Sequence, residues 1–170
     1  MELPGSIYLY ALATVSITFV GFSAILLIFR QAIGGAMTRY DTYFMLSFIK
    51  SGFIVTAGSL LPPVLALYGL SPSAVWRVSS VTMAIAVFMF VVTLPGRRRA
   101  ASRQRIPMYI LILLFVQVLI ASYLLINGIG GPIEPRAAPY AAAMTGLLFT
   151  YGIAYLRALA TVLGESERSM

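Results

Sequence analysis

The sequence predicts an all-α integral membrane protein, a single domain built as a bundle of five transmembrane helices. Of its 170 residues, 60% are hydrophobic and 10% are charged, whereas about 25% of the residues of a typical soluble domain are charged. So few charges cannot cover a globular surface, and we therefore expect lipid to solvate most of the chain. A spanning helix needs roughly 20 apolar residues, and five such stretches fill almost the whole sequence. The predicted spans cover about residues 7–29, 44–69, 73–94, 107–127 and 140–162.

The first predicted span carries a weakly polar stripe. Tyr10, Thr14 and Thr18 recur at every fourth residue, so one face of a helix presents all three. Hydroxyl groups in a span bond to carbonyls of their own helix or to a neighbouring helix, and the stripe therefore predicts a helix–helix contact. The alternative is that it forms one wall of a polar path. No basic segment precedes the stretch and no small-residue cleavage site follows it, so we expect a retained helix rather than a signal peptide.

The second predicted span contains a proline pair and the single lysine of the chain. Pro62 and Pro63 both lack a backbone N–H, and each ring clashes with the carbonyl four residues earlier, so we expect a helix break or kink there. Lys50 lies near one end of the span, with Ser47 and Ser51 close to it on the helix. Snorkelling of the ammonium group to the interface accounts for such a position; the alternative is an anion or lipid-phosphate site. An activated Ser/Lys pair is not favoured, because a boundary position does not desolvate the lysine.

The third predicted span has a start signal and a stop signal. Ser71 is a suitable N-cap, and Pro72 suits the first helical position. We expect the helix to end at Leu94, because Pro95 and Gly96 should not continue it. The stretch between these signals is about as long as a spanning helix has to be.

The segment that follows holds five of the twelve basic residues and no acid. Short loops rich in Lys and Arg stay on the cytoplasmic side of a membrane, so the segment first predicts sidedness. A further possibility is contact with acidic lipid headgroups at the inner face, at about 1 kcal/mol per basic residue. The basic residues are Arg97, Arg98, Arg99, Arg103 and Arg105.

The last two predicted spans each hold one informative feature. In the fourth span, Gln117 is expected to bond to a neighbouring helix, as lone glutamines in spans usually do. In the fifth, small residues recur at every fourth position, which predicts a ridge for a closely packed helix from this chain or from another copy. Arg157 lies near the end of that span. As for Lys50, the side chain either snorkels to the interface or belongs to an anion or lipid-phosphate site. The ridge consists of Ala142, Gly146, Thr150, Ala154 and Ala158.

Five spans place the two termini on opposite sides of the membrane. With the arginine-rich segment in the cytoplasm, ten of the twelve basic residues fall inside and only Arg77 and Arg136 fall outside. This asymmetry predicts an outer N-terminus and a cytoplasmic C-terminus. Arg outnumbers Lys eleven to one, a bias typical of GC-rich bacterial genomes, so the expected location is a bacterial inner membrane.

The composition excludes several chemistries. The chain has no Cys and no His, so disulfides, thiolate nucleophiles, haem held by histidine, and thiolate or imidazole metal sites are ruled out. The predicted spans contain no Asp or Glu, which argues against intramembrane proton relays. We expect no metal, no cofactor and no nucleic-acid partner, because the net charge of +7 is explained as a topology signal.

These observations favour a small non-catalytic membrane protein. We expect it to act by helix–helix association, as a subunit or scaffold in a homo- or hetero-oligomer. The alternative is an oligomeric channel or carrier that favours anions, for which the candidate residues are Lys50, Ser47, Ser51, Arg157, Tyr10, Thr14 and Thr18. A membrane enzyme is the least favoured class, because no catalytic side-chain arrangement is apparent.

Overall fold

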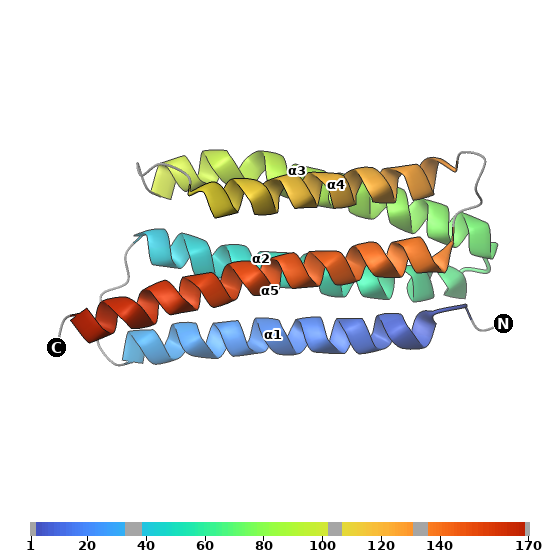
Figure 1. The fold of residues 1–170 in the computed structure, drawn as a ribbon. Coiled ribbons are helices and arrows are strands. Elements are labelled where there is room, and N and C mark those ends of the chain that lie inside the picture. The colour runs from blue at the N-terminus through green and yellow to red at the C-terminus, as the bar shows by residue number, and fades with distance from the viewer. Residues whose placement is uncertain (1–2, 33–38, 102–106, 131–135, 169–170) are drawn as a thin grey trace.

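The computed structural model describes residues 3–32, 39–101, 107–130 and 136–168. Within these ranges every regular element is an α-helix, and the prediction of an all-α fold is confirmed for them. The helices lie side by side along a common direction (Figure 1). They are α1 (Ser6–Ala32), α2 (Arg39–Leu67), α3 (Pro72–Ala101), α4 (Met108–Ile129) and α5 (Ala137–Arg168).

Four of these helices contain a stretch that is long and apolar enough to cross a membrane. The stretches are Ser6–Ile25, Met45–Leu67, Pro72–Gly96 and Met108–Ile129. This supports a multi-pass membrane protein. Among the described residues, α5 has no such stretch. A transmembrane α5 is therefore not shown.

The bundle consists of two helical hairpins with α5 between them. α1 packs mainly against α2, and α3 packs mainly against α4. α5 contacts all four other helices, most extensively α4 and α2. Figure 1 shows α5 running along α2, with the α3–α4 pair on one side and α1 on the other.

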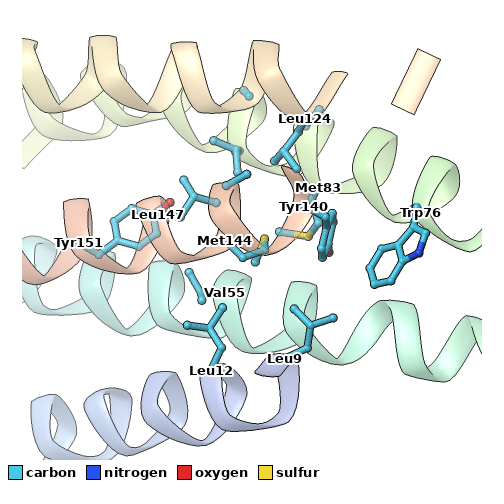
Figure 2. Close-up of a cluster of buried hydrophobic side chains, with 14 of the residues drawn as sticks. Leu9, Leu12, Val55, Trp76, Met83, Leu124, Tyr140, Met144, Leu147 and Tyr151 are labelled. Carbon is cyan, nitrogen blue, oxygen red and sulfur yellow. The ribbon is translucent and has the colours of Figure 1, made fainter. Parts of the chain in front are cut away.

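Apolar side chains from all five helices fill the centre of the bundle (Figure 2). Leu9, Val55, Leu124 and Leu147 are at most 1% exposed, so each contributes about 1.5–3 kcal/mol of burial free energy relative to an exposed side chain in water. Gly58 of α2 leaves room for two methionine side chains of this core. The large apolar residues on the outer faces suit contact with lipid, and they include Phe22, Phe53, Phe88, Phe115 and Phe149.

Of the two outcomes predicted at Pro62 and Pro63, a break is not found, and a kink stays a prediction. α2 continues through both prolines to Leu67, and both rings are buried. Proline has a fixed φ near −65°, which suits a helix, and the backbone group that it frees can bond to a neighbouring helix. The structure supplies such a bond, because the Tyr140 hydroxyl donates to the carbonyl oxygen of Gly58, four residues before Pro62, at 2.6 Å.

The predicted start of the third helix is confirmed, and its predicted end is wrong. The Ser71 hydroxyl oxygen accepts a hydrogen bond from the backbone N–H of Ala74 at 3.4 Å, at the start of α3. The helix does not end at Leu94 but continues through Pro95 to Ala101. The carbonyl of Leu94, next to this proline, accepts a hydrogen bond from the Tyr43 hydroxyl of α2 at 3.1 Å.

Candidate functional site

A cavity of about 70 Å³ lies between α2, α3, α4 and α5, near the end of the bundle where α3 ends and α4 begins. No described side chain of α1 belongs to its wall. The described side chains that line it are all uncharged, and most are aromatic or aliphatic. They are Tyr43, Ser47, Phe48, Ser51, Phe90, Leu94, Tyr109, Ile110, Leu113, Leu114, Gln117, Tyr151 and Ala154.

The cavity continues the faces of the helices that form the core. Val55 follows Ser51 by four residues on α2, and Leu147 precedes Tyr151 by four residues on α5, so each pair shares a helix face. Both apolar side chains are 0% exposed, and Figure 2 shows Leu147 beside Tyr151 in the core cluster. Toward the middle of the bundle the cavity thus meets packed apolar side chains. We call it a recess.

Two side chains in the cavity wall carry buried oxygen atoms without a hydrogen-bond partner. Gln117 is 5% exposed and Tyr151 is 4% exposed. Neither the Gln117 carboxamide oxygen Oε1 nor the Tyr151 hydroxyl has a partner among the described residues. Leaving such a group unpaired costs about 1–3 kcal/mol. The interhelical hydrogen bond predicted for Gln117 is therefore not made by its oxygen atom.

Aromatic side chains frame these two polar groups. The rings of Tyr151 and Phe90 meet edge to face, with centroids 5.9 Å apart and an interplanar angle of 76°. Ser51, at 2% exposed, donates its hydroxyl proton to the Phe48 carbonyl of its own helix at 2.8 Å. The polar groups of the recess are thus held in a mainly apolar wall, in which electrostatic interactions are strong.

The structure separates Lys50 from the two serines with which the sequence associated it. Lys50 is exposed, whereas Ser47 and Ser51 line the cavity. The Ser47 hydroxyl donates to the Tyr43 carbonyl at 2.8 Å, and Ser51 bonds within its own helix as well. The exposure of Lys50 is what snorkelling requires, and the alternative, an anion or lipid-phosphate site at this turn, stays a prediction.

Arg157 lies at the margin of the cavity wall. Its guanidinium carbon is 5.6 Å from the centroid of the Tyr109 ring, a cation–π contact between α5 and α4. Arg157 itself is exposed, and exposed contacts of this kind contribute about 0.5–1 kcal/mol. Tyr109 also lines the cavity, so the ring separates the arginine from the recess.

The hydroxyl stripe of α1 faces outward. Tyr10, Thr14 and Thr18 are all exposed. The Thr14 hydroxyl donates to the Tyr10 carbonyl at 2.9 Å, and the Thr18 hydroxyl donates to the Thr14 carbonyl at 2.8 Å. The threonines therefore need no external donor or acceptor, and the face on which they lie is open to lipid or to another protein.

The small-residue ridge of α5 is covered in its middle by α4 of the same chain. A Cβ atom on Gly146 would lie 3.3 Å from Cδ1 of Ile120. Thr150 is buried, Ala154 lines the cavity and Ala142 is exposed. The side chain of Ala158, the last residue of the ridge, is not among those described.

The arginine-rich segment contributes no described side chain. Arg97, Arg98 and Arg99 belong to the last turns of α3, but their side chains lie outside the described part of the structure. Arg103 and Arg105 lie outside the described residues altogether. The predicted contact of these arginines with acidic lipid therefore stays a prediction.

Two tyrosines of α5 were not identified as site residues by sequence reasoning. Pro62 leaves the Gly58 carbonyl without its helical donor, so a hydrogen-bond donor from another helix could be expected. Which residue supplies the donor depends on how α5 is aligned along α2, and in the structure it is Tyr140. Tyr151 is a large residue among small ones in the middle of α5. This contrast in size was the only sequence signal that could have identified it as a site residue. Among the described residues, no group of three or more His, Cys, Asp or Glu side chains could hold a metal ion.

Comparison of the chain with protein-family models, with curated proteins and with solved structures returned no match.

Proposed function

We propose that this chain is a five-span protein of a bacterial inner membrane that acts, without catalysis, as a subunit or scaffold of a membrane complex. The observation that carries this proposal is the outward face of α1. Tyr10, Thr14 and Thr18 are exposed there, and a Cβ atom on Gly21 would meet nothing within 4 Å. Membrane helices associate through faces of this kind, where small and hydroxyl-bearing residues let two backbones approach closely.

The role of α5 as a fifth span is part of the proposal. Its direction along the other helices in Figure 1 supports it, as does its contact with all four of them. Seven of the described residues of α5 are buried against the bundle, while Phe149, Ile153 and Leu156 are exposed on its outer side, where lipid would lie around a spanning helix. The seven buried residues are Tyr140, Ala143, Met144, Leu147, Thr150, Tyr151 and Tyr155.

Disulfide cross-linking in native membranes tests the association. The chain has no cysteine, so Thr14→Cys and Thr18→Cys each place a single thiol on the proposed contact face. We expect oxidation to give cross-linked homodimers, or a heteromeric adduct after a partner's thiol reacts. Leu119→Cys is the matched control, because Leu119 is 52% exposed on the outer face of α4. Equal cross-linking at Leu119 and at the two threonine positions would overturn the proposal.

The second candidate, an oligomeric channel or carrier, is favoured by the same outward stripe of hydroxyl groups. Several copies that joined through α1 could surround a shared path, with exposed Lys50 favouring anions. Anion and cation flux from liposomes that contain the purified protein separates the two candidates. A subunit or scaffold gives no flux above empty liposomes, whereas a channel or carrier gives anion flux that Thr14→Leu and Thr18→Leu reduce.

A further inference from the structure

We propose that Pro62 and Pro63 form a hinge in α2, and that the hydrogen bond from the Tyr140 hydroxyl to the Gly58 carbonyl keeps this hinge closed. When the bond breaks, the terminal segment of α2, residues 64–67, tilts away from the bundle while the part of α2 before the hinge stays in place. This movement goes beyond the proposed role as a subunit and does not depend on it.

The two prolines remove two successive helical hydrogen bonds from α2. Neither has an N–H to donate to the carbonyl four residues earlier, which belongs to Gly58 for Pro62 and to the next residue for Pro63. A helix bends more easily where these bonds are missing, and sharp bends in helices are found mainly at proline. The Gly58 carbonyl accepts the Tyr140 hydroxyl at 2.6 Å, so a side chain of α5 replaces one of the bonds that α2 lacks.

The side on which the prolines lie sets the direction of the movement. Both residues are buried, so their rings lie toward the bundle. A proline ring clashes with the carbonyl four residues earlier, which opens the helix on the side of the ring and bends it away from that side. Release of the Tyr140 hydroxyl should therefore tilt the terminal segment away from the centre of the bundle.

The packing on both sides of the hinge differs in a way that suits this movement. Before the prolines, α2 contributes fully buried side chains such as Val55 to the core. In the terminal segment Leu65 and Ala66 are only partly buried, and the other two residues are exposed. Beside Gly58 lie the ends of the Met83 and Met144 side chains, and methionine adapts to a shift of its neighbours because its side chain is unbranched and flexible.

Ser59 makes the closed hinge depend more strongly on Tyr140. This serine precedes the prolines, it is 0% exposed, and its hydroxyl has no hydrogen-bond partner among the described residues. Burial of an unpaired hydroxyl is unfavourable, so the closed arrangement is less stable than one in which every polar group is paired. The bond from Tyr140 is thus the interhelical hydrogen bond that the structure shows at the hinge.

Electron spin–spin distance measurements on the purified protein in lipid nanodiscs test the hinge. The chain has no Cys, so Ile7→Cys on α1 and Leu67→Cys on α2 would carry the only two spin labels, both at exposed positions. The start of α1 is a suitable reference, because the hydroxyls of Tyr8 and Thr145 bond it to α5 at 2.6 Å. We expect one narrow distance distribution in the parent protein. Tyr140→Phe should raise the ratio of open to closed protein about tenfold, the effect expected for one buried hydrogen bond, and this appears as a second population at longer distance.

A label pair on the other side of the hinge is the matched control. Ile25→Cys and Leu46→Cys lie at exposed positions of the same two helices, and Tyr140→Phe should not change the distance between them. Pro62→Ala restores the helical N–H and should remove the longer population when it is added to Tyr140→Phe. The proposal is wrong if Tyr140→Phe leaves the first pair unchanged, or if it broadens both pairs equally.

The double variant also decides the case in which Tyr140→Phe alone does not fold, as judged by size-exclusion chromatography in detergent. A folded Pro62→Ala, Tyr140→Phe protein with the distances of the parent would support the hinge, because the tyrosine is then needed only where proline has removed the helical bond. A double variant that also fails to fold would show that the Tyr140 hydroxyl is required independently of Pro62, and the proposal would be rejected.

Discussion

The hydroxyl of Tyr140 on α5 donates a 2.6 Å hydrogen bond to the carbonyl oxygen of Gly58 on α2. Pro62, four residues after Gly58, has no N–H with which to make the usual helical bond. A neighbouring helix thus replaces the bond that the proline removes, and α2 continues through the proline pair. Tyr140 is 0% exposed, so no solvent could take its place.

Tyr140→Phe removes this donor and leaves the Gly58 carbonyl unpaired. We expect a loss of about 1–3 kcal/mol in the free energy of unfolding, measured as a lower apparent Tm in detergent. Tyr123→Phe, on the exposed side of α4, is the control and should change stability by no more than about 0.5 kcal/mol.

A double-mutant cycle gives the same relationship a sharper test. Pro62→Ala restores a backbone N–H to the helical bond with Gly58. Tyr140→Phe should therefore cost less in the Pro62→Ala background than in the parent protein. Equal costs in both backgrounds would mean that the tyrosine stabilises the bundle by packing alone.

Gly128→Ala should force α3 and α4 apart. A Cβ atom at Gly128 would lie 3.0 Å from the backbone nitrogen of Val81 and 3.2 Å from the carbonyl oxygen of Arg77, and backbone atoms cannot move away as the end of a side chain can. Overpacking of this kind costs about 1–3 kcal/mol, which thermal melting would report. Gly152→Ala is the control, since a Cβ atom there meets nothing within 4 Å; this variant should be unchanged, or more stable by up to about 1 kcal/mol.

Labelling of single cysteines from outside intact cells tests the proposed orientation. Ser102→Cys lies in the arginine-rich segment and Glu134→Cys lies between the fourth and fifth predicted spans. A membrane-impermeant maleimide should label only Glu134→Cys, and both sites should react after the membrane is permeabilised. The reverse pattern would invert the orientation. Labelling of both sites in intact cells would place both on the outer side, and would rule out any arrangement in which α4 is the single span between them.

The helices of this chain could be predicted because their signals are local. Composition and the apolar stretches indicate an all-α fold, and Ser71 was identified as an N-cap from its position before Pro72. The prolines misled the prediction in two places. Proline was expected to end or interrupt a helix, but α2 continues through Pro62 and α3 continues through Pro95. At Pro62, the side chain of a neighbouring helix bonds to the carbonyl that the proline frees, a partner that no local sequence pattern reveals.

The candidate site could be predicted only in part, because it depends on how four helices are aligned along one another. Ser47 and Ser51 were identified as polar residues of interest and do line the cavity. Their association with Lys50 came from proximity in sequence, and the orientation of α2 in the bundle separates them. Tyr151 and Gln117 lie 34 residues apart in the printed sequence, and no local pattern shows that both contribute to one cavity wall.

Asn127 should stabilise the junction of three helices at the end of the bundle opposite the cavity. Its side-chain N–H donates to the Ser80 hydroxyl of α3 at 2.8 Å, and its oxygen accepts from the backbone N–H of Arg136, just before α5, at 3.2 Å. Asn127→Leu removes these bonds, together with the one that its side-chain N–H donates to the Arg136 carbonyl at 3.4 Å. We expect a loss of about 1–3 kcal/mol, seen as a lower apparent Tm. The same variant should speed backbone hydrogen exchange at the start of α5, because the Arg136 N–H loses its acceptor. Ser122→Ala, an exposed polar change on the same helix, should alter neither measurement. An Asn127→Leu variant with unchanged melting and unchanged exchange would show that apolar packing alone holds this junction.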